Sequence, residues 1–238
     1  MVNDLFEVVH ENSDLLVVNK PAGLVCHPTK TDERSSLIGR VRLHLGHAEG
    51  RLVNRLDRET SGLVLVAKSA SVAGELGRLI ESNAVEKKYA AIVHGFLSLG
   101  EFTIDAALGK DESSAVAIKD GVRPDGAAAR TQVWVEKCFV QKGGEFSLLR
   151  IQPLNGRKHQ IRIHLAHVGH PIVGDKIYGG DEQIYLRLVR GEMTDADRAR
   201  LLLANHALHA GRLKFHWRSQ EWEFRAEPEK EFRDFAGL

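Results

Sequence analysis

The sequence predicts an α+β fold whose sheet is mixed, mainly antiparallel and flanked by helices. Short apolar runs typical of strands stand beside stretches with helical periodicity, and the two kinds of segment do not alternate regularly. Regular alternation would instead favour an all-parallel sheet. The chain of 238 residues is long enough to bury a large core, in one large domain or two small ones.

Five segments predict the elements of the first hundred residues. Residues 14–19 are typical of a short strand, which a Lys-Pro-Ala-Gly turn follows. Apolar positions within residues 37–45 and 72–80 recur at helical spacing, which predicts two amphipathic helices. The continuous apolar run at 62–67 and the segment at 89–93 predict two further strands.

The second half of the chain begins with a weakly patterned stretch, residues 99–130. We expect either a mobile insertion or a hairpin that closes on a substrate. Beyond it, the sequence predicts antiparallel strands at 131–136 and 146–152 around a turn at Gly143-Gly144, and two strands at 207–216 and 221–225. Thr194 and Asp197 have capping-box spacing, which predicts the start of a helix that extends through Leu203.

The polar stretch at 54–62 is the first candidate site, because it places a carboxylate, Asp57, between two arginines, Arg55 and Arg58. Nearby cations keep a carboxylate ionised, which suits a nucleophile or a fixed anion better than a proton donor. Functional residues also collect on loops that lead into core strands. The same pattern is typical of a solvated salt-bridge cluster, so the spacing alone leaves both interpretations open.

A second candidate segment, residues 156–165, has the sequence Gly-Arg-Lys-His-Gln-Ile-Arg-Ile-His-Leu. Polar and apolar residues alternate in its later part, which predicts a strand with Gln160, Arg162 and His164 on one face. The other face would pack Ile161, Ile163 and Leu165 into the core. A strand of this kind would hold the Arg162 guanidinium in place as a charge partner for a carboxylate such as Asp57.

The overall charge is nearly balanced, with 33 basic and 32 acidic side chains and a net charge of +1. Residues 146–174 contain no acidic side chain, although they include three arginines, a lysine and four histidines. We therefore expect a local basic face that could bind phosphates. The histidine spacing fits no closed zinc site, and the neighbouring cations oppose a dication, so we expect no metal.

Other features of the composition favour a cytoplasmic protein that is not inserted in a membrane. No apolar run is long enough for a membrane span. The first residues, with Asn3, Asp4 and Glu7, are unlike a signal peptide. Two cysteines, Cys26 and Cys138, are too few for a disulfide framework, and we expect both to be reduced thiols.

Taken together, five segments at family-like spacing resemble the RluA-type pseudouridine synthases, which isomerise uridine in ribosomal or transfer RNA. The segments are Asn-Lys-Pro-Ala-Gly-Leu at 19–24, Arg-Leu-Asp-Arg-Glu-Thr-Ser-Gly at 55–62, Lys-Lys-Tyr-Ala-Ala at 87–91, Gly-Arg-Lys-His-Gln-Ile-Arg-Ile-His at 156–164 and Gly-His-Pro-Ile-Val-Gly-Asp at 169–175. The resemblance implies the pseudouridine synthase fold, with a catalytic cleft across its sheet, and a single catalytic domain that contains residues 1–238. It also implies RNA as the partner of a monomer that needs no cofactor or metal.

The resemblance also implies roles for individual residues. Asp57 would be the nucleophile, Arg162 its partner, and Tyr89 the ring that stacks on a flipped base. The substrate would be bound by Arg55, Thr60, Ser61, Gly62, Arg157, Lys158, His159, Gln160 and Ile163. Thr60 to Gly62 would form the turn that delivers Asp57, and the cations would contact phosphates.

Two departures from the family pattern are visible. Asn54 stands where relatives usually have His; an amide can still donate and accept hydrogen bonds, but it cannot titrate. Many relatives also carry an N-terminal RNA-binding domain of the S4 type. Because residues 15–19 already match the first strand of the catalytic domain, we expect no S4 domain here, and RNA affinity would come from the catalytic domain.

Several alternatives stay open at the level of sequence. Asp57 could attack either the ribose anomeric carbon or the uracil ring, and the RNA could be ribosomal or transfer RNA. A catalytically silent RNA-binding protein would not need the set of Asp57, Tyr89 and Arg162. A glycoside hydrolase usually needs a second carboxylate, which the acid-free segment around Arg162 does not supply.

Overall fold

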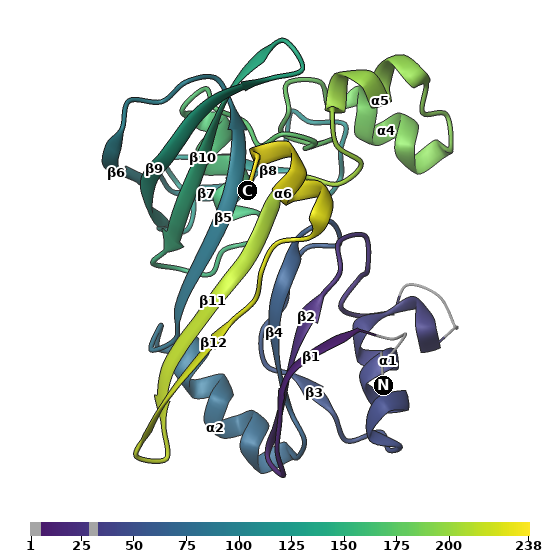
Figure 1. Ribbon diagram of the computed structural model, residues 1–238, viewed down its shortest axis with the longest axis vertical. Helices are drawn as coiled ribbons and strands as arrows, with labels where there is room; N and C mark the ends of the chain where they lie inside the picture. The colour runs from purple at the N-terminus through teal and green to yellow at the C-terminus, as the bar shows by residue number, and fades with distance from the viewer. Residues whose placement is uncertain (1–5, 29–32) are drawn as a thin grey trace. The chain divides into compact units, whose positions relative to one another are not determined.

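The computed structural model describes residues 6–28 and 33–238, and the chain divides into two compact units (Figure 1). The first unit contains residues 1–88 and 209–229, and the second contains residues 89–208 and 230–238. Asn3 and Asp4 of the expected N-terminal pattern lie outside the described residues.

The first unit is built on strands in the order β1-β2-β4-β11, with β3 paired to β4 and β12 paired to β11. Their bounds are β1 Glu7–Glu11, β2 Leu15–Lys20, β3 Arg51–Leu52, β4 Ser61–Ala67, β11 Leu208–Trp217 and β12 Gln220–Arg225. The pairing of β4 with β11 is parallel, whereas β2 runs antiparallel to both β1 and β4. These strands confirm those predicted at 14–19, 62–67, 207–216 and 221–225.

The apolar run of β4 is uninterrupted because both faces of this strand are covered. Leu63 and Leu65 pack in one core with residues of α2 (Ala70–Glu81). Val64 and Val66 pack in a second core with residues of α1 (Leu37–Leu45), which follows the short 3-10 helix η1 (Glu33–Ser35). Alternate residues of a strand point to opposite faces, so each face needs its own apolar residues. Both helices predicted from periodicity are confirmed.

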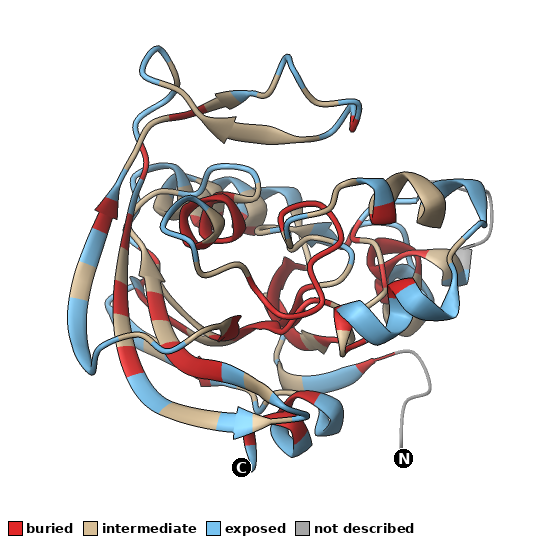
Figure 2. Cartoon of the chain, turned by 90° about the horizontal axis from the view of Figure 1, so that it is seen from above, coloured by how far each residue is buried: buried red, intermediate tan, exposed pale blue. Residues whose placement is uncertain are grey.

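The second unit contains an antiparallel set of strands in the order β5-β10-β9-β6. These are β5 (Glu86–His94, in this unit from Tyr89 on), β6 (Gly100–Asp105), β9 (Arg130–Gln141) and β10 (Gly144–Pro153). Buried residues alternate with less buried ones along the first half of β9 (Figure 2). The turn between β9 and β10 is Lys142-Gly143, one residue before the predicted position, and both residues have positive φ.

The weakly patterned stretch at 99–130 contains a hairpin, and its expected closing on a substrate stays a prediction. Its strands are β7 (Leu108–Lys110) and β8 (Asp120–Val122), which pair only with each other among the described strands. A small apolar cluster that includes Leu108, Val116, Ile163 and Ile177 anchors the hairpin to the rest of the unit.

The segment predicted as a strand at 156–165 is instead largely a helix, α3 (Gln160–His167). Gln160 through Leu165 are all buried. The alternation of polar and apolar residues in this segment therefore does not separate an exposed face from a buried face. The polar side chains bond to partners inside the unit, so the helix can be buried on all sides. The strand prediction was therefore wrong, and the alternating faces assigned to Arg162 and Ile163 do not exist.

Three further helices complete the second unit: α4 (Gln183–Arg190), α5 (Asp195–Leu201) and α6 (Lys230–Ala236). The capping box of Thr194 and Asp197 is confirmed, and the helix ends at Leu201, two residues before the predicted end. The α+β class with a mixed, mainly antiparallel sheet and flanking helices is confirmed. That residues 1–238 form one domain stays a prediction.

Within the described ranges, no helix combines the length and the apolar composition that a membrane crossing requires. The same ranges hold no group of three or more metal-binding side chains.

Candidate active site

The loop between β3 and β4 holds Asp57 in the first unit. Asp57 is half-buried, whereas Arg55 and Arg58 are exposed. The Thr60 N–H donates to the Asp57 carbonyl over 3.2 Å, which closes a turn. Arg58 Nε donates to the Gly23 carbonyl over 3.1 Å, so one of the two arginines ties the loop to the turn after β2.

Lys20, at the end of β2, supports the Asp57 loop from inside the unit. Its fully buried ammonium donates to the carbonyls of Pro21 (2.8 Å), Leu24 (2.8 Å) and Arg58 (3.1 Å). Burial lowers the pKa of Lys20 to about 8, although the charges of neighbouring groups, Asp57 among them, act to raise it. This role of Lys20 was not predicted from the sequence, although a lysine directly after an apolar strand was a usable signal.

Cys26 holds the residue that precedes Asp57. Its sulfur lies 3.4 Å from both the backbone nitrogen and the carbonyl oxygen of Leu56. Burial is the main reason why the pKa of this thiol is raised, so it is a neutral group at physiological pH. Both cysteines are free thiols, as expected.

Asn54 joins the start of the loop to the neighbouring strand. Its Oδ1 accepts from the Leu65 N–H over 2.7 Å, and its Nδ2 donates to the Leu63 carbonyl over 3.2 Å. The backbone N–H of Val53 donates to the Leu65 carbonyl just before it, over 2.8 Å. The amide side chain therefore continues the β3–β4 ladder by one step, a role that needs a donor and an acceptor but no charge.

Thr60, Ser61 and Gly62 are buried, and the last two belong to β4 rather than to the predicted turn. A side-chain Cβ at Gly62 (φ 115°) would lie 2.4 Å from the Ala210 carbonyl oxygen, so only glycine fits beside β11. Ser61 Oγ lies 2.9 Å from His209 Nδ1, and His209 Nε2 lies 2.9 Å from the Ala226 carbonyl. Because Nε2 must donate to that carbonyl, a neutral His209 accepts from Ser61.

In the second unit, Arg162 projects from α3 into a buried ion pair with Asp175. Its Nε and Nη2 donate to the two carboxylate oxygens over 2.7 and 2.9 Å. Burial alone would raise the pKa of Asp175, but the charge and hydrogen bonds of Arg162 hold that pKa well below its usual range. The Arg162 guanidinium also lies over the Tyr178 ring, 5.0 Å from its centre.

The residues that begin α3 bond mainly to their own unit. The Gln160 amide donates to the Arg130 carbonyl and to Thr131 Oγ1, both over 3.0 Å, and its oxygen accepts from the Arg157 N–H. His159 caps the helix from the left-handed region, at φ 54°, and its Nδ1 lies 2.9 Å from the Tyr178 hydroxyl. Gln160 thus shapes the start of α3; its proposed contact with substrate stays a prediction.

The acid-free stretch at 146–174 is not a surface of unpaired cations. Arg150 pairs with Glu136, Lys158 with Asp120, and Arg162 with Asp175, so carboxylates from outside the stretch neutralise these charges. Arg157 Nε donates to the Ala128 carbonyl over 3.2 Å. Arg157 and Lys158 are nevertheless exposed at the surface of the unit.

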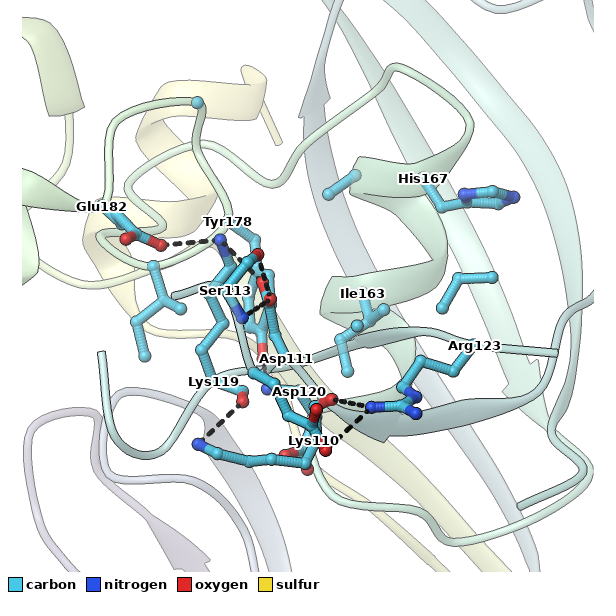
Figure 3. A pocket seen from close by; sticks show the side chains of 16 residues that line it. Lys110, Asp111, Ser113, Lys119, Asp120, Arg123, Ile163, His167, Tyr178 and Glu182 are labelled. Atoms are coloured by element: carbon cyan, nitrogen blue, oxygen red, sulfur yellow. Dashed lines mark hydrogen bonds and ion pairs between the residues drawn. The ribbon is translucent and has the colours of Figure 1, made fainter. Parts of the chain in front are cut away.

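Tyr89 and Ile163 also lie in the second unit. Tyr89 is half-buried on β5, opposite Ile151 of β10. Ile163 lines a pocket of about 710 Å³ between α3, the β7–β8 hairpin and the segment around Tyr178 (Figure 3). Hairpin residues such as Lys119 and Arg123 stand around it, and their charges are paired with carboxylates.

The predicted site residues thus fall into two groups. Arg55, Asp57, Thr60, Ser61 and Gly62 belong to the first unit, and Tyr89, Arg157, Lys158, His159, Gln160, Arg162 and Ile163 belong to the second. Within the second unit, the structure brings Arg162 and His159 to the same tyrosine, Tyr178, which the sequence analysis did not single out.

Comparison with known proteins identifies the class. Residues 14–167 match the family model described as RNA pseudouridylate synthase. A Bacillus subtilis protein named uncharacterized RNA pseudouridine synthase YlyB is 34% identical over 229 residues, which are 92% of this chain and 68% of that protein. Ribosomal large subunit pseudouridine synthase D of Pseudomonas aeruginosa is 32% identical over 222 residues, 88% of this chain and 67% of that protein.

Solved structures agree on the fold. Human RNA pseudouridylate synthase domain containing 4 superposes with a TM-score of 0.70 at 25% identity, over 95% of this chain and 90% of that one. Human RNA pseudouridylate synthase domain containing 1 superposes with a TM-score of 0.76 at 24% identity, over 96% and 85% of the two chains. The fold and the matched motifs are those of an RNA-modifying isomerase. The chain belongs to the RNA pseudouridylate synthase family, which confirms the RluA-type resemblance.

The chain spans less than two thirds of the length of several other relatives. It covers 55% of an Aquifex aeolicus protein named uncharacterized RNA pseudouridine synthase, to which it is 32% identical over 179 residues, or 72% of this chain.

Proposed function

We propose that the protein converts specific uridines of ribosomal or transfer RNA to pseudouridine, with Asp57 as the nucleophile. The observation that supports the proposal most is that the family match at 14–167 includes Asp57, Tyr89 and Arg162 together. The Pseudomonas relative named for the large ribosomal subunit favours ribosomal RNA as the first substrate to test. We further propose a cytoplasmic monomer that needs no cofactor.

In the proposed reaction, the target uridine first leaves its stack at a cost of a few kcal/mol. Asp57 then forms a covalent bond with the nucleotide, either at the ribose anomeric carbon or at the uracil ring. The bond between ribose and N1 breaks, the base turns, ring carbon 5 bonds to the ribose, and the bond to Asp57 breaks. Carbon 5 loses its proton and N1 gains one, so the product is an isomer of the substrate.

The proposed role of Arg162 is to keep Asp57 ionised and oriented, because a nearby guanidinium favours the charged form of a carboxylate. Tyr89 would stack on the flipped base, and Ile163 would contact it from the side. Arg55, Arg157 and Lys158 are exposed and would contact phosphates, which position an RNA without specifying its sequence. Lys158 would then exchange its pairing with Asp120 for a phosphate.

The nucleophile is tested with RNA that carries tritium at carbon 5 of uridine, prepared from cells that lack this protein. Asp57→Asn should abolish tritium release while its circular dichroism spectrum matches that of the wild type. Asp195→Asn is the matched control, since that side chain is fully exposed and should release tritium at the normal rate. Normal turnover by Asp57→Asn would contradict the proposal.

A further inference from the structure

The surroundings of Arg162 suggest how its guanidinium is held. Arg162 and Asp175 are both buried, and their side chains meet through two parallel hydrogen bonds of 2.7 and 2.9 Å. Arginine and carboxylate groups that pair in this way fix both the position and the plane of the guanidinium. A single contact would leave the plane free to rotate.

The carboxylate of Asp175 is itself held by backbone. Its Oδ1 accepts from the N–H groups of Ile177 and Tyr178, over 2.9 and 3.0 Å, in addition to the bond from Arg162. Asp175 therefore cannot follow a movement of Arg162 without breaking the turn that it closes. The carboxylate is a fixed anchor, and the guanidinium takes its orientation from it.

Tyr178 fixes the guanidinium from its face. Its ring lies 5.0 Å from the Arg162 guanidinium carbon, within the range of a cation–π interaction. The ring is held in turn by its hydroxyl, which accepts from the Asp120 N–H over 3.2 Å and lies 2.9 Å from His159 Nδ1. Arg162 is therefore held both along one edge and over one face.

We propose that Asp175 is a positioning residue for the reaction, which fixes the position and the plane of the Arg162 guanidinium for its proposed role. The inference rests on the proposed role of Arg162. Two of the five guanidinium N–H groups bond to Asp175, so its carboxylate sets the plane in which the group lies. Catalysis would depend on orientation, because a misplacement of about 1 Å can cost roughly 100-fold in rate.

The central variant is Asp175→Asn, assayed by single-turnover tritium release at saturating enzyme together with RNA affinity. We expect the rate to fall by about 100-fold, while RNA affinity stays nearly unchanged, because orientation and not binding is lost. Asp175→Glu separates position from charge, since it restores the carboxylate but displaces it by one methylene. A positioning role predicts that Asp175→Glu stays slow.

Asp197→Asn is the matched control, because Asp197 forms a similar two-bond pair with Arg187 in the same unit, at 2.9 and 2.5 Å. It should lower the melting temperature but leave the rate per folded molecule unchanged. If Asp175→Asn does not fold, Tyr178→Leu tests the same orientation from the face, and a slower rate at unchanged affinity is again expected.

Three results would overturn the inference: a folded Asp175→Asn at the wild-type rate, full rescue by Asp175→Glu, or a wild-type rate for Tyr178→Leu when Asp175→Asn is unfolded. A failure of the proposed function looks different. In that case the wild-type protein releases no tritium, or Asp57→Asn releases it normally, whatever the Asp175 variants do.

Discussion

The two regions that carry the proposed catalytic residues are built in different ways. In the first unit, Asp57 sits on a loop whose shape is fixed by bonds to backbone, from Lys20, Asn54 and Cys26. In the second unit, Arg162 sits on a buried helix, where a charged partner and an aromatic ring hold it. The loop leaves its carboxylate half-buried, and the helix hides its guanidinium almost completely.

The difference fits the two proposed tasks. A nucleophile must approach a substrate, so it cannot be enclosed, and the supports of Asp57 therefore bind the loop backbone rather than the carboxylate alone. A charge partner acts through its position and its electric field, and that field is stronger where water is excluded. Its supports can bind the charged group directly, as Asp175 and Tyr178 do.

The largest effect on stability is expected from breaking the buried pair in the second unit. Arg162→Met should lower the free energy of unfolding by about 3–5 kcal/mol, because it leaves the Asp175 carboxylate buried without its cation. The double variant Arg162→Met/Asp175→Leu should recover only part of that loss, since it removes the orphaned charge but leaves the Ile177 and Tyr178 N–H groups without their acceptor. Urea denaturation of the three proteins measures both differences.

The pH dependence of the same variants gives an independent check. In the wild type, Arg162 holds the pKa of Asp175 below its ordinary value of 3.8, so the pair stabilises the fold above that pH and the stabilisation is lost in acid. In Arg162→Met, burial without a cation should raise the pKa instead. That variant should then regain stability relative to the wild type as the pH falls. If the two proteins instead show parallel curves of unfolding free energy against pH, Asp175 is not isolated from water.

The comparison also shows where sequence reasoning worked. The run at 62–67 was predictable, because only a strand with two covered faces uses six consecutive apolar or small residues. The segment at 160–165 was misassigned because its polar residues are buried: Gln160 and His164 reach Thr131, and Arg162 reaches Asp175. These partners are far away in the sequence, and no local pattern encodes them. Tyr178 was missed for the same reason, whereas Lys20 follows an apolar strand directly, which was a local signal that was not used.

The second largest effect is expected in the first unit. Lys20→Met should destabilise the protein by roughly 2 kcal/mol at neutral pH, because three carbonyls lose a charged donor inside the unit. It should also slow tritium release, since the Arg58 carbonyl next to Asp57 loses its anchor. A variant with wild-type stability would show that the loop does not depend on this lysine. Lys68→Met, which removes an ammonium bound to Glu11 near the surface, is the matched control.

The pH dependence of Lys20 has a defined sign. Burial lowers its pKa from 10.5 to about 8 in the folded protein, so between these values the unfolded chain holds more protons than the folded one. The stability of the wild type relative to Lys20→Met should therefore rise as the pH increases from 8 to 10.5. The difference between the two unfolding curves at pH 7.5 and pH 10 measures this rise.

The smallest effect separates shape from charge at the start of the Asp57 loop. Asn54→Ala removes a donor and an acceptor from the buried strand β4 and should cost about 1–2 kcal/mol. Asn54→His introduces the residue that the family resemblance leads us to expect at this position, and a neutral imidazole can supply one donor and one acceptor. We expect Asn54→His to approach wild-type stability at pH 8.

The same variant should lose stability below about pH 6, because a protonated imidazole has no acceptor for the Leu65 N–H. The wild-type amide cannot titrate, so its loop should keep its stability over that range apart from effects shared by both proteins. Thermal unfolding of the wild type, Asn54→Ala and Asn54→His at pH 8 and pH 5.5 measures the difference. If Asn54→His has the same stability relative to the wild type at both pH values, the imidazole does not replace the amide in the β3–β4 ladder. Other contacts would then hold the start of the Asp57 loop.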